Sequence, residues 1–165
     1  MGHTGMTIRP ARAADAPELA GLLNAIIARG GTTALEEPLA PGELAEAMLL
    51  GPGVICCFVA EDHAGVLAGF QSLTRSAYLP GDIGDIGTFA RPGQVQRGTG
   101  SRLFAATRSL AAAWGLAAIN ATIRADNAGG LAFYGRLGFT EHGVARAIPL
   151  RDGTPIDRIS KRFTL

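Results

Sequence analysis

A glycine-interrupted segment at residues 94–104 constrains the fold more than any other part of this chain. It reads Gln-Val-Gln-Arg-Gly-Thr-Gly-Ser-Arg-Leu-Phe and runs from a predicted strand directly into a predicted amphipathic helix. Because Gly98 and Gly100 lack a Cβ, the backbone can bend so that several N–H groups converge at the positive end of the helix dipole. The segment therefore predicts a binding site for a pyrophosphate.

Two common nucleotide-binding motifs fit this segment poorly. The spacing of Gly93 and Gly98 matches the first two glycines of a P-loop, but Thr99 and Gly100 stand where that motif requires Lys and Ser or Thr. A dinucleotide fingerprint would need a third glycine at position 103, which is Leu103, and a strand early in the chain. Both interpretations are disfavoured.

The composition is that of a single compact domain. At 165 residues with 47% hydrophobic content, the chain can bury one substantial core, so residues 1–165 are expected to form one domain. The formal net charge of +1 and the scattered basic residues disfavour nucleic acid or an anionic membrane as a partner.

No targeting or membrane-spanning segment is predicted, so a cytoplasmic location is the default expectation. The two cysteines, Cys56 and Cys57, are adjacent in a predicted strand and would point to opposite faces of a sheet. They predict neither a disulfide framework nor a metal site, and we expect two buried thiols.

Hydrophobic spacing predicts alternating strands and helices. Short apolar runs predict strands at 7–10, 54–60, 66–74, 83–91 and 117–124, with two weaker strands in 140–163 around Arg151-Asp-Gly153. Helical spacing predicts a first helix ending near Gly30 and a second beginning near Pro41. A third helix, ending at Gly115, should form one apolar face from Leu103, Phe104, Thr107, Leu110, Ala111 and Trp114. This order predicts an α/β (α+β) fold, a mixed sheet with helices on both faces.

A second motif follows the fifth predicted strand. It reads Asn127-Ala-Gly-Gly-Leu-Ala-Phe-Tyr134-Gly-Arg-Leu-Gly-Phe139. Together with Gly98-Thr-Gly100, it resembles the two ordered signatures of the GNAT N-acetyltransferases, and the resemblance covers most of the chain. Segments 24–38 and 153–161 are similar to the phosphinothricin N-acetyltransferase branch of that family.

The resemblance implies a particular sheet and a particular cofactor. In GNAT proteins a mostly antiparallel sheet of about six or seven strands splays between its fourth and fifth strands, here 85–90 and 117–123. The pantetheine arm of acetyl-CoA enters there and pairs with a free strand edge. No metal is implied. The implied cofactor-binding residues are Phe89, Ala90, Gln96, Arg97, Gly98, Thr99, Gly100, Ser101, Asn127 and Tyr134.

Two residues are candidates for acid–base catalysis of acyl transfer. An amine must lose a proton before it attacks, and a departing thiolate is helped by a nearby acid. Tyr134 matches the family tyrosine and is the candidate acid, with simple core packing as the alternative. Asp85 lies on one wall of the splay and is the candidate base, directly or through a water. The alternative is that Asp82 and Asp85 only belong to a glycine-rich loop.

Two further sites carry open alternatives. Asn127 precedes a predicted helix, so it is expected to cap that helix and to contact the coenzyme. Glu36 and Glu37 lie in a segment that resembles a substrate loop. If either carboxylate faces the site, it would favour a cationic or amino-bearing acceptor; the alternative is a solvated pair.

These residues favour one function among three. The leading hypothesis is transfer of an acetyl group from acetyl-CoA to the primary amine of a small, amino-acid-like acceptor in a ternary complex. A protein N-terminal or lysine acetyltransferase is the second, and a non-catalytic acyl-CoA sensor is the third. A homodimer is expected only because dimers are common in the resembled branch.

Overall fold

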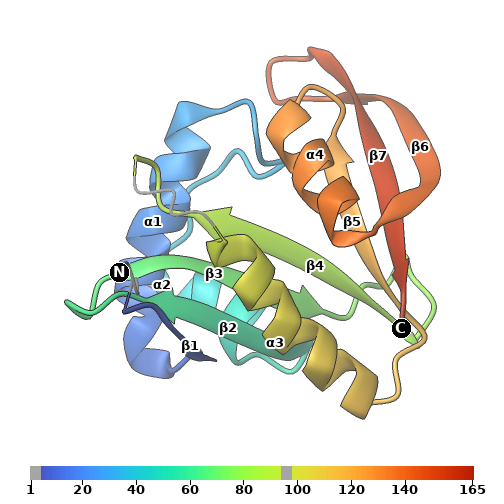
Figure 1. Cartoon of the computed structure of the whole chain (residues 1–165). Helices are drawn as coiled ribbons and strands as arrows, with labels where there is room; N and C mark the ends of the chain where they lie inside the picture. The colour runs from blue at the N-terminus through green and yellow to red at the C-terminus, as the bar shows by residue number, and fades with distance from the viewer. Residues whose placement is uncertain (1–4, 94–97) are drawn as a thin grey trace.

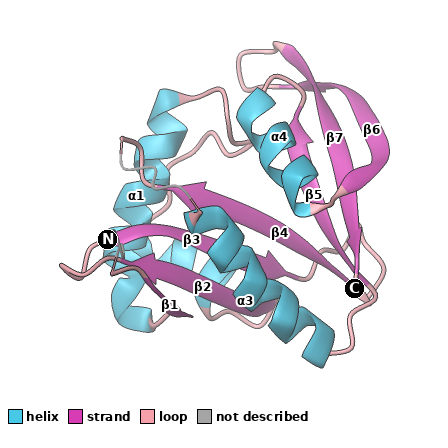
Figure 2. Ribbon diagram, in the orientation of Figure 1, coloured by secondary structure: helices cyan, strands magenta, loops and turns pink. Residues whose placement is uncertain are grey.

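The computed structural model describes residues 5–93 and 98–165, which form one seven-stranded sheet with helices on both faces (Figures 1 and 2). The described helices and strands follow the predicted order closely. Their bounds are β1 Thr7–Pro10, η1 Ala13–Asp15, α1 Ala16–Arg29, α2 Pro41–Leu44, η2 Ala45–Leu49, β2 Val54–Glu61, β3 Leu67–Thr74, β4 Ile83–Ala90, α3 Thr99–Ala113, β5 Ala118–Arg124, α4 Ala128–Leu137, β6 Thr140–Pro149 and β7 Pro155–Thr164.

The sheet is antiparallel except at its centre. Its strand order is β1-β2-β3-β4-β5-β7-β6, and β4 pairs with β5 in parallel. The predicted mixed, mostly antiparallel sheet is therefore confirmed. The turn between β6 and β7 contains Gly153 at φ 88°, a left-handed conformation that glycine adopts without strain.

The parallel pair separates after three residues. Ile83, Gly84 and Asp85 of β4 pair with Ala118, Ile119 and Asn120 of β5, and no pairing continues beyond them. By contrast, β4 pairs with β3 from residue 85 to residue 90, and β5 pairs with β7 along its whole length. Figure 1 shows the two strands diverging from this point. The carboxyl half of β4 therefore has a free edge facing the gap.

Hydrophobic cores fill both faces of the sheet. One core joins α1, α2 and η2 to β2 and β3, with Leu19, Leu23 and Phe70 fully buried. The opposite core joins α3 and α4 to the sheet, and Phe104 and Phe139 are buried there. Figure 1 shows α3 and α4 on the same side of the sheet.

Two helix predictions need correction. The predicted helix from Pro41 is a four-residue α-helix that continues as a π-helical turn, Ala45–Leu49. Trp114 does not join the buried face of α3; it is 52% exposed, and the Arg75 guanidinium lies 5.4 Å from its ring centroid. The helix ends at Ala113, so Trp114 does not continue its buried face. Cation–π stacking with Arg75 stabilises the ring at the surface instead.

Gly100, in the first turn of α3, lies against the Phe133 ring of α4. A Cβ at this position would lie 2.5 Å from Cε2 of Phe133, so the Phe133 ring would have to shift to accept any larger residue. Gly21 on α1 offers a contrast, because a Cβ there meets nothing within 4 Å.

We predict that Gly100→Ala destabilises the fold by about 1–3 kcal/mol, because the added methyl group overpacks this contact. Chemical denaturation measures the change. The control, Gly21→Ala, should stabilise the protein by roughly 0.5–1 kcal/mol, since alanine is the better helix former. Equal effects of the two substitutions would contradict a packing role for Gly100.

Candidate functional site

The gap between β4 and β5 opens into a cleft of about 1920 Å³. Its walls come from β4, β5 and β7, the first turn of α3, the helix α4 and the segment after α1. Of the predicted site residues, Asp85, Phe89, Ala90, Gly98, Thr99, Gly100, Ser101, Asn127 and Tyr134 line it. Gln96 and Arg97 lie outside the described residues.

The first turn of α3, residues 98–101, lines the cleft with the backbone geometry expected of an anion cradle. Gly98 caps the helix in a left-handed conformation at φ 87°, which explains the need for glycine at this position. The first helical bond runs from the N–H of Arg102 to the carbonyl of Gly98. The N–H groups of Thr99, Gly100 and Ser101 therefore lack helical acceptors and lie at the positive end of the helix dipole.

Asp85 lies where β4 and β5 separate. Its Oδ1 accepts a hydrogen bond of 3.1 Å from Nδ2 of Asn120, its register partner on β5. Oδ1 of Asn120 in turn accepts from Nε of Arg162 at 2.8 Å. Burial raises the pKa of the Asp85 carboxyl above its usual range, while Asn120 and Arg162 oppose the shift. The carboxyl is therefore a stronger base than an exposed aspartate.

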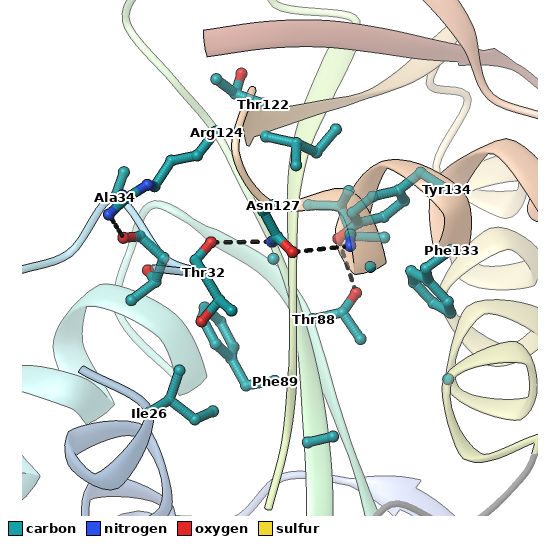
Figure 3. A pocket seen from close by; sticks show the side chains of 18 of the residues that line it. Ile26, Thr32, Ala34, Thr88, Phe89, Thr122, Arg124, Asn127, Phe133 and Tyr134 are labelled. Carbon is teal, nitrogen blue, oxygen red and sulfur yellow. Dashed lines mark hydrogen bonds between the residues drawn. The ribbon is translucent and has the colours of Figure 1, made fainter. Parts of the chain in front are cut away.

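Tyr134 reaches the cleft from α4. Its ring packs against Phe133 and Phe139, and its hydroxyl lies 2.9 Å from Oγ1 of Thr88 on β4 (Figure 3). Burial raises the pKa of the phenol to about 12, the Asp85 charge adds to the rise, and the hydrogen bond with Thr88 opposes it. The residue is thus both part of the aromatic core and a polar group of the cleft.

Asn127 makes two contacts with one side chain. Its Oδ1 accepts from the N–H of Gly130 at 2.9 Å, so the predicted N-cap of α4 is confirmed. Its Nδ2 donates to the carbonyl of Thr32 at 3.0 Å, which connects α4 to the segment after α1 (Figure 3). A contact between Asn127 and coenzyme stays a prediction.

Residues 30–39 form a strap along the cleft. Besides the Asn127 contact, Nη1 of Arg124 donates to the carbonyl of Thr33 at 3.3 Å. Near the other end of the strap, Asn24 exchanges two hydrogen bonds with the backbone of Leu39, at 2.8 and 2.9 Å. The strap therefore connects α1, on one half of the split sheet, to β5 and α4 on the other half.

Glu36 and Glu37 lie in the strap and contact the turn between β6 and β7. Glu36 accepts from the backbone N–H of Arg151 in the turn between β6 and β7, and Glu37 forms an ion pair with the Arg151 side chain. Neither carboxylate lines the cleft among the residues that the structure describes. A substrate contact at these two residues therefore stays a prediction, and the structure gives it no geometric support.

Comparison with known proteins identifies the family. The sequence model of the Acetyltransferase (GNAT) family matches residues 25–139. This chain belongs to the GNAT acetyltransferase family. No curated protein matches it.

Solved structures share the fold along the whole chain. A protein assigned as a phosphinothricin N-acetyltransferase is 25% identical, with a TM-score of 0.84, over 97% of this chain and 98% of the other. A phosphinothricin acetyltransferase from Sinorhizobium meliloti, solved with acetyl-CoA, is 23% identical, with a TM-score of 0.83, over 98% of this chain and 89% of the other. An assigned acetyltransferase from Salmonella typhimurium, also solved with acetyl-CoA, is 21% identical, with a TM-score of 0.82, over 98% and 94%.

The GNAT cleft contains polar residues that the sequence analysis missed. Thr88, Asn120, Thr122 and Arg162 line it, and Thr88 and Asn120 contact the two candidate catalytic residues. Asn120, Thr122 and Arg124 alternate with apolar residues along β5, which is a sequence signal for one polar face. Thr88 has no such signal, because its partner Tyr134 is 46 residues away in the sequence.

Within residues 5–93 and 98–165, no group of three His, Cys, Asp or Glu side chains is arranged to hold a metal ion. In the same ranges, no helix combines the length and the apolar character that crossing a membrane requires.

We predict that two substitutions of Asn127 separate its two contacts. Asn127→Asp keeps the acceptor for the Gly130 N–H but removes the donor to Thr32, so the strap should exchange amide hydrogens faster while α4 keeps its cap. Asn127→Ala removes both and should also destabilise the protein by about 0.5–2 kcal/mol. Hydrogen exchange of residues 30–35 and chemical denaturation measure the two effects. Identical behaviour of the two variants would contradict this division.

We predict that Asp85→Asn stabilises the protein at neutral pH. Because the folded-state pKa of Asp85 is raised above its usual 3.8, its contribution to stability is fully present at low pH and is lost as pH rises through the folded-state pKa. The introduced amide never ionises, so the variant avoids the cost of burying a charged carboxylate at high pH. Its melting temperature should therefore be higher than that of the wild type by roughly 2–4 °C at pH 7.5, and this gain should shrink toward pH 4. A gain that is independent of pH would contradict this assignment.

Proposed function

We propose that this GNAT protein transfers the acetyl group of acetyl-CoA to the primary amine of a small, amino-acid-like acceptor by direct attack in a ternary complex. The observation that carries the proposal is the single cleft that an anion cradle, a free strand edge, Asp85 and Tyr134 all line. Each of these features supplies one requirement of the reaction.

The described residues fit acetyl-CoA, which supplies an activated acetyl thioester when bound. The backbone N–H groups of residues 99–101 would hold its pyrophosphate, and Gly98 allows the turn that exposes them. The free edge of β4 near Phe89 and Ala90 would pair with the amides of its pantetheine arm. Gln96, Arg97 and Asn127 remain proposed contacts.

Asp85 would act as the general base. Burial raises the pKa of the Asp85 carboxyl toward the pKa of an attacking ammonium group, which favours proton transfer between them. Asp85 would take the proton of the amine directly or through one water. The hydrogen bond from Asn120 orients one carboxylate oxygen. Tyr134 would act as the general acid and donate its phenolic proton to the departing sulfur.

The charge of the cleft favours an acceptor with an anionic group. Arg158 and Arg162 of β7 line it, and neither forms an ion pair in the part of the chain that the structure describes. Asp85 is the one carboxylate among the described lining residues. An amino acid satisfies both requirements, because its amine could face Asp85 and its carboxylate could face an arginine.

The strap disfavours the protein acetyltransferase alternative. Hydrogen bonds from Arg124 and Asn127 hold residues 32 and 33 at the cleft, which narrows the space for an extended peptide. The acyl-CoA sensor alternative is disfavoured by Asp85 and Tyr134, because binding alone needs neither an acid nor a base.

We predict that the protein releases coenzyme A thiol from acetyl-CoA in the presence of free amino acids or phosphinothricin. Each amino acid should react at least about tenfold faster than the amine that lacks its α-carboxylate, the effect of about one charge-assisted hydrogen bond. A thiol-release assay on matched pairs, such as methionine and 3-(methylthio)propylamine, measures this ratio. Turnover restricted to peptides would support the protein acetyltransferase instead.

Two variants test the roles within that reaction. Asp85→Asn and Tyr134→Phe should each lower the turnover number by about 10²-fold or more, while calorimetry shows coenzyme A bound as tightly as by the wild type. Asp82→Asn, in the exposed loop before β4, is the matched control. Intact binding without turnover of any acceptor by the wild type would favour the sensor, and absent binding of coenzyme A would refute the whole proposal.

A further inference from the structure

Gln71 on β3 is a polar residue in the buried interior of the protein. Its side chain is fully buried, and its Oε1 has no hydrogen-bond partner in the described part of the chain. An unpaired buried polar atom costs about 1–3 kcal/mol, so an apolar side chain of similar size would pack here with less penalty. The other end of the amide suggests why glutamine is present.

The amide nitrogen of Gln71 begins a chain of hydrogen bonds that ends in the cleft. Gln71 and Thr88 are register partners on β3 and β4, and Nε2 donates to Oγ1 of Thr88 at 2.9 Å. The same Oγ1 lies 2.9 Å from the hydroxyl of Tyr134, as Figure 3 shows. Thr88 therefore stands between a buried donor and the candidate acid.

The donor from Gln71 restricts where the protons can lie. Thr88 has one hydroxyl proton, and Gln71 and Tyr134 are its side-chain partners among the described residues. Because Nε2 cannot accept, the Thr88 proton is used in a hydrogen bond only if it points to the oxygen of Tyr134. The phenolic proton is then free to point into the cleft.

A reversed amide would have the opposite effect. With Oε1 facing Thr88, the Thr88 proton would point to Gln71, and Tyr134 would have to donate its own proton to Thr88. The phenol would then be unable to protonate a leaving group without first breaking that bond.

We propose that Gln71 is a positioning residue that sets the direction of the hydrogen bond between Thr88 and Tyr134 and so directs the phenolic proton toward the leaving sulfur. The inference rests on the proposed role of Tyr134. The amine nitrogen forms a bond to the acetyl carbon, and the bond between that carbon and the sulfur breaks. The electron pair of the broken bond stays on the sulfur, which takes the proton from Tyr134. The phenolate accepts the Thr88 hydrogen bond and regains a proton from solvent.

Two substitutions of Gln71 test the proposal. Gln71→Glu introduces a carboxyl group that donates to Thr88 when protonated and only accepts when ionised. The ratio of variant to wild-type turnover should therefore fall by about tenfold or more between about pH 6 and pH 9, where buried carboxyl groups titrate. Gln71→Met removes the amide, so the turnover of this variant should be about threefold lower than that of the wild type at every pH.

A second readout needs no acceptor and uses coenzyme A as the probe. The chain has two tyrosines, so labelling the ring carbon that bears the hydroxyl in a Tyr78→Phe background gives one NMR signal, from Tyr134. In the coenzyme A complex, ionisation of the introduced carboxyl should shift this signal, because the phenol changes from accepting to donating the Thr88 bond. Asp85, whose charge also acts on Tyr134, is present in both proteins, so the step that reports the introduced carboxyl is the one seen in the Gln71→Glu variant and not in the protein without the Gln71 substitution. The dispersion of the variant's spectrum reports that it is folded.

The outcomes separate this inference from the proposed function. A pH-independent turnover ratio together with a Tyr134 signal that does not move would overturn the role of Gln71, even if Tyr134→Phe is inactive. If Gln71→Glu does not fold, Gln71→Met with wild-type turnover would overturn it as well. Full activity of Tyr134→Phe would refute both the inference and the proposed acid.

Discussion

The end of pairing between β4 and β5 is the feature on which the site depends. Two parallel strands normally continue their ladder, but here each keeps an antiparallel partner on its outer side and loses the inner one after Asp85 and Asn120. Side chains take over at that point, since Asn120 donates to Asp85 and accepts from Arg162 on the next strand. The bridge holds the candidate base where the cleft begins.

Other contacts connect the two halves of the sheet at a distance from that point. The Phe133 ring on α4 contacts Gly100 in the first turn of α3, and the strap connects α1 to α4 through Thr32 and Asn127. The second contact shares a side chain with the cap of α4, because Asn127 both donates to Thr32 of the strap and accepts from the N–H of Gly130. Loosening the strap and weakening the helix cap are therefore separable only by substitutions that treat the two ends of that amide differently.

Much of the fold and part of the site followed from local sequence. Gly98 and Asn127 were predictable because a left-handed cap and a helix N-cap depend on residues within one turn. The contact of Glu36 with Arg151 was not, because it joins segments 115 residues apart and no charge pattern specifies that pairing. The chain of hydrogen bonds from Gln71 through Thr88 to Tyr134 could not be predicted for a related reason. It depends on the register between β3 and β4, and a shift of one residue would turn Gln71 to the other face.

The acidity of Tyr134 explains why the direction of one hydrogen bond matters. The phenol has a pKa of about 12, whereas an ordinary alkyl thiol has a pKa near 8.5. Proton transfer from this phenol to the thiolate therefore costs roughly 5 kcal/mol of free energy. Two of the interactions that set the phenol pKa can change during the reaction. Protonation of Asp85 by the incoming amine removes the negative charge that helps to raise the phenol pKa, and a proton from Thr88 stabilises the phenolate as it forms. The base would thus activate the acid, provided that Thr88 donates rather than accepts, and the amide of Gln71 is placed to decide that.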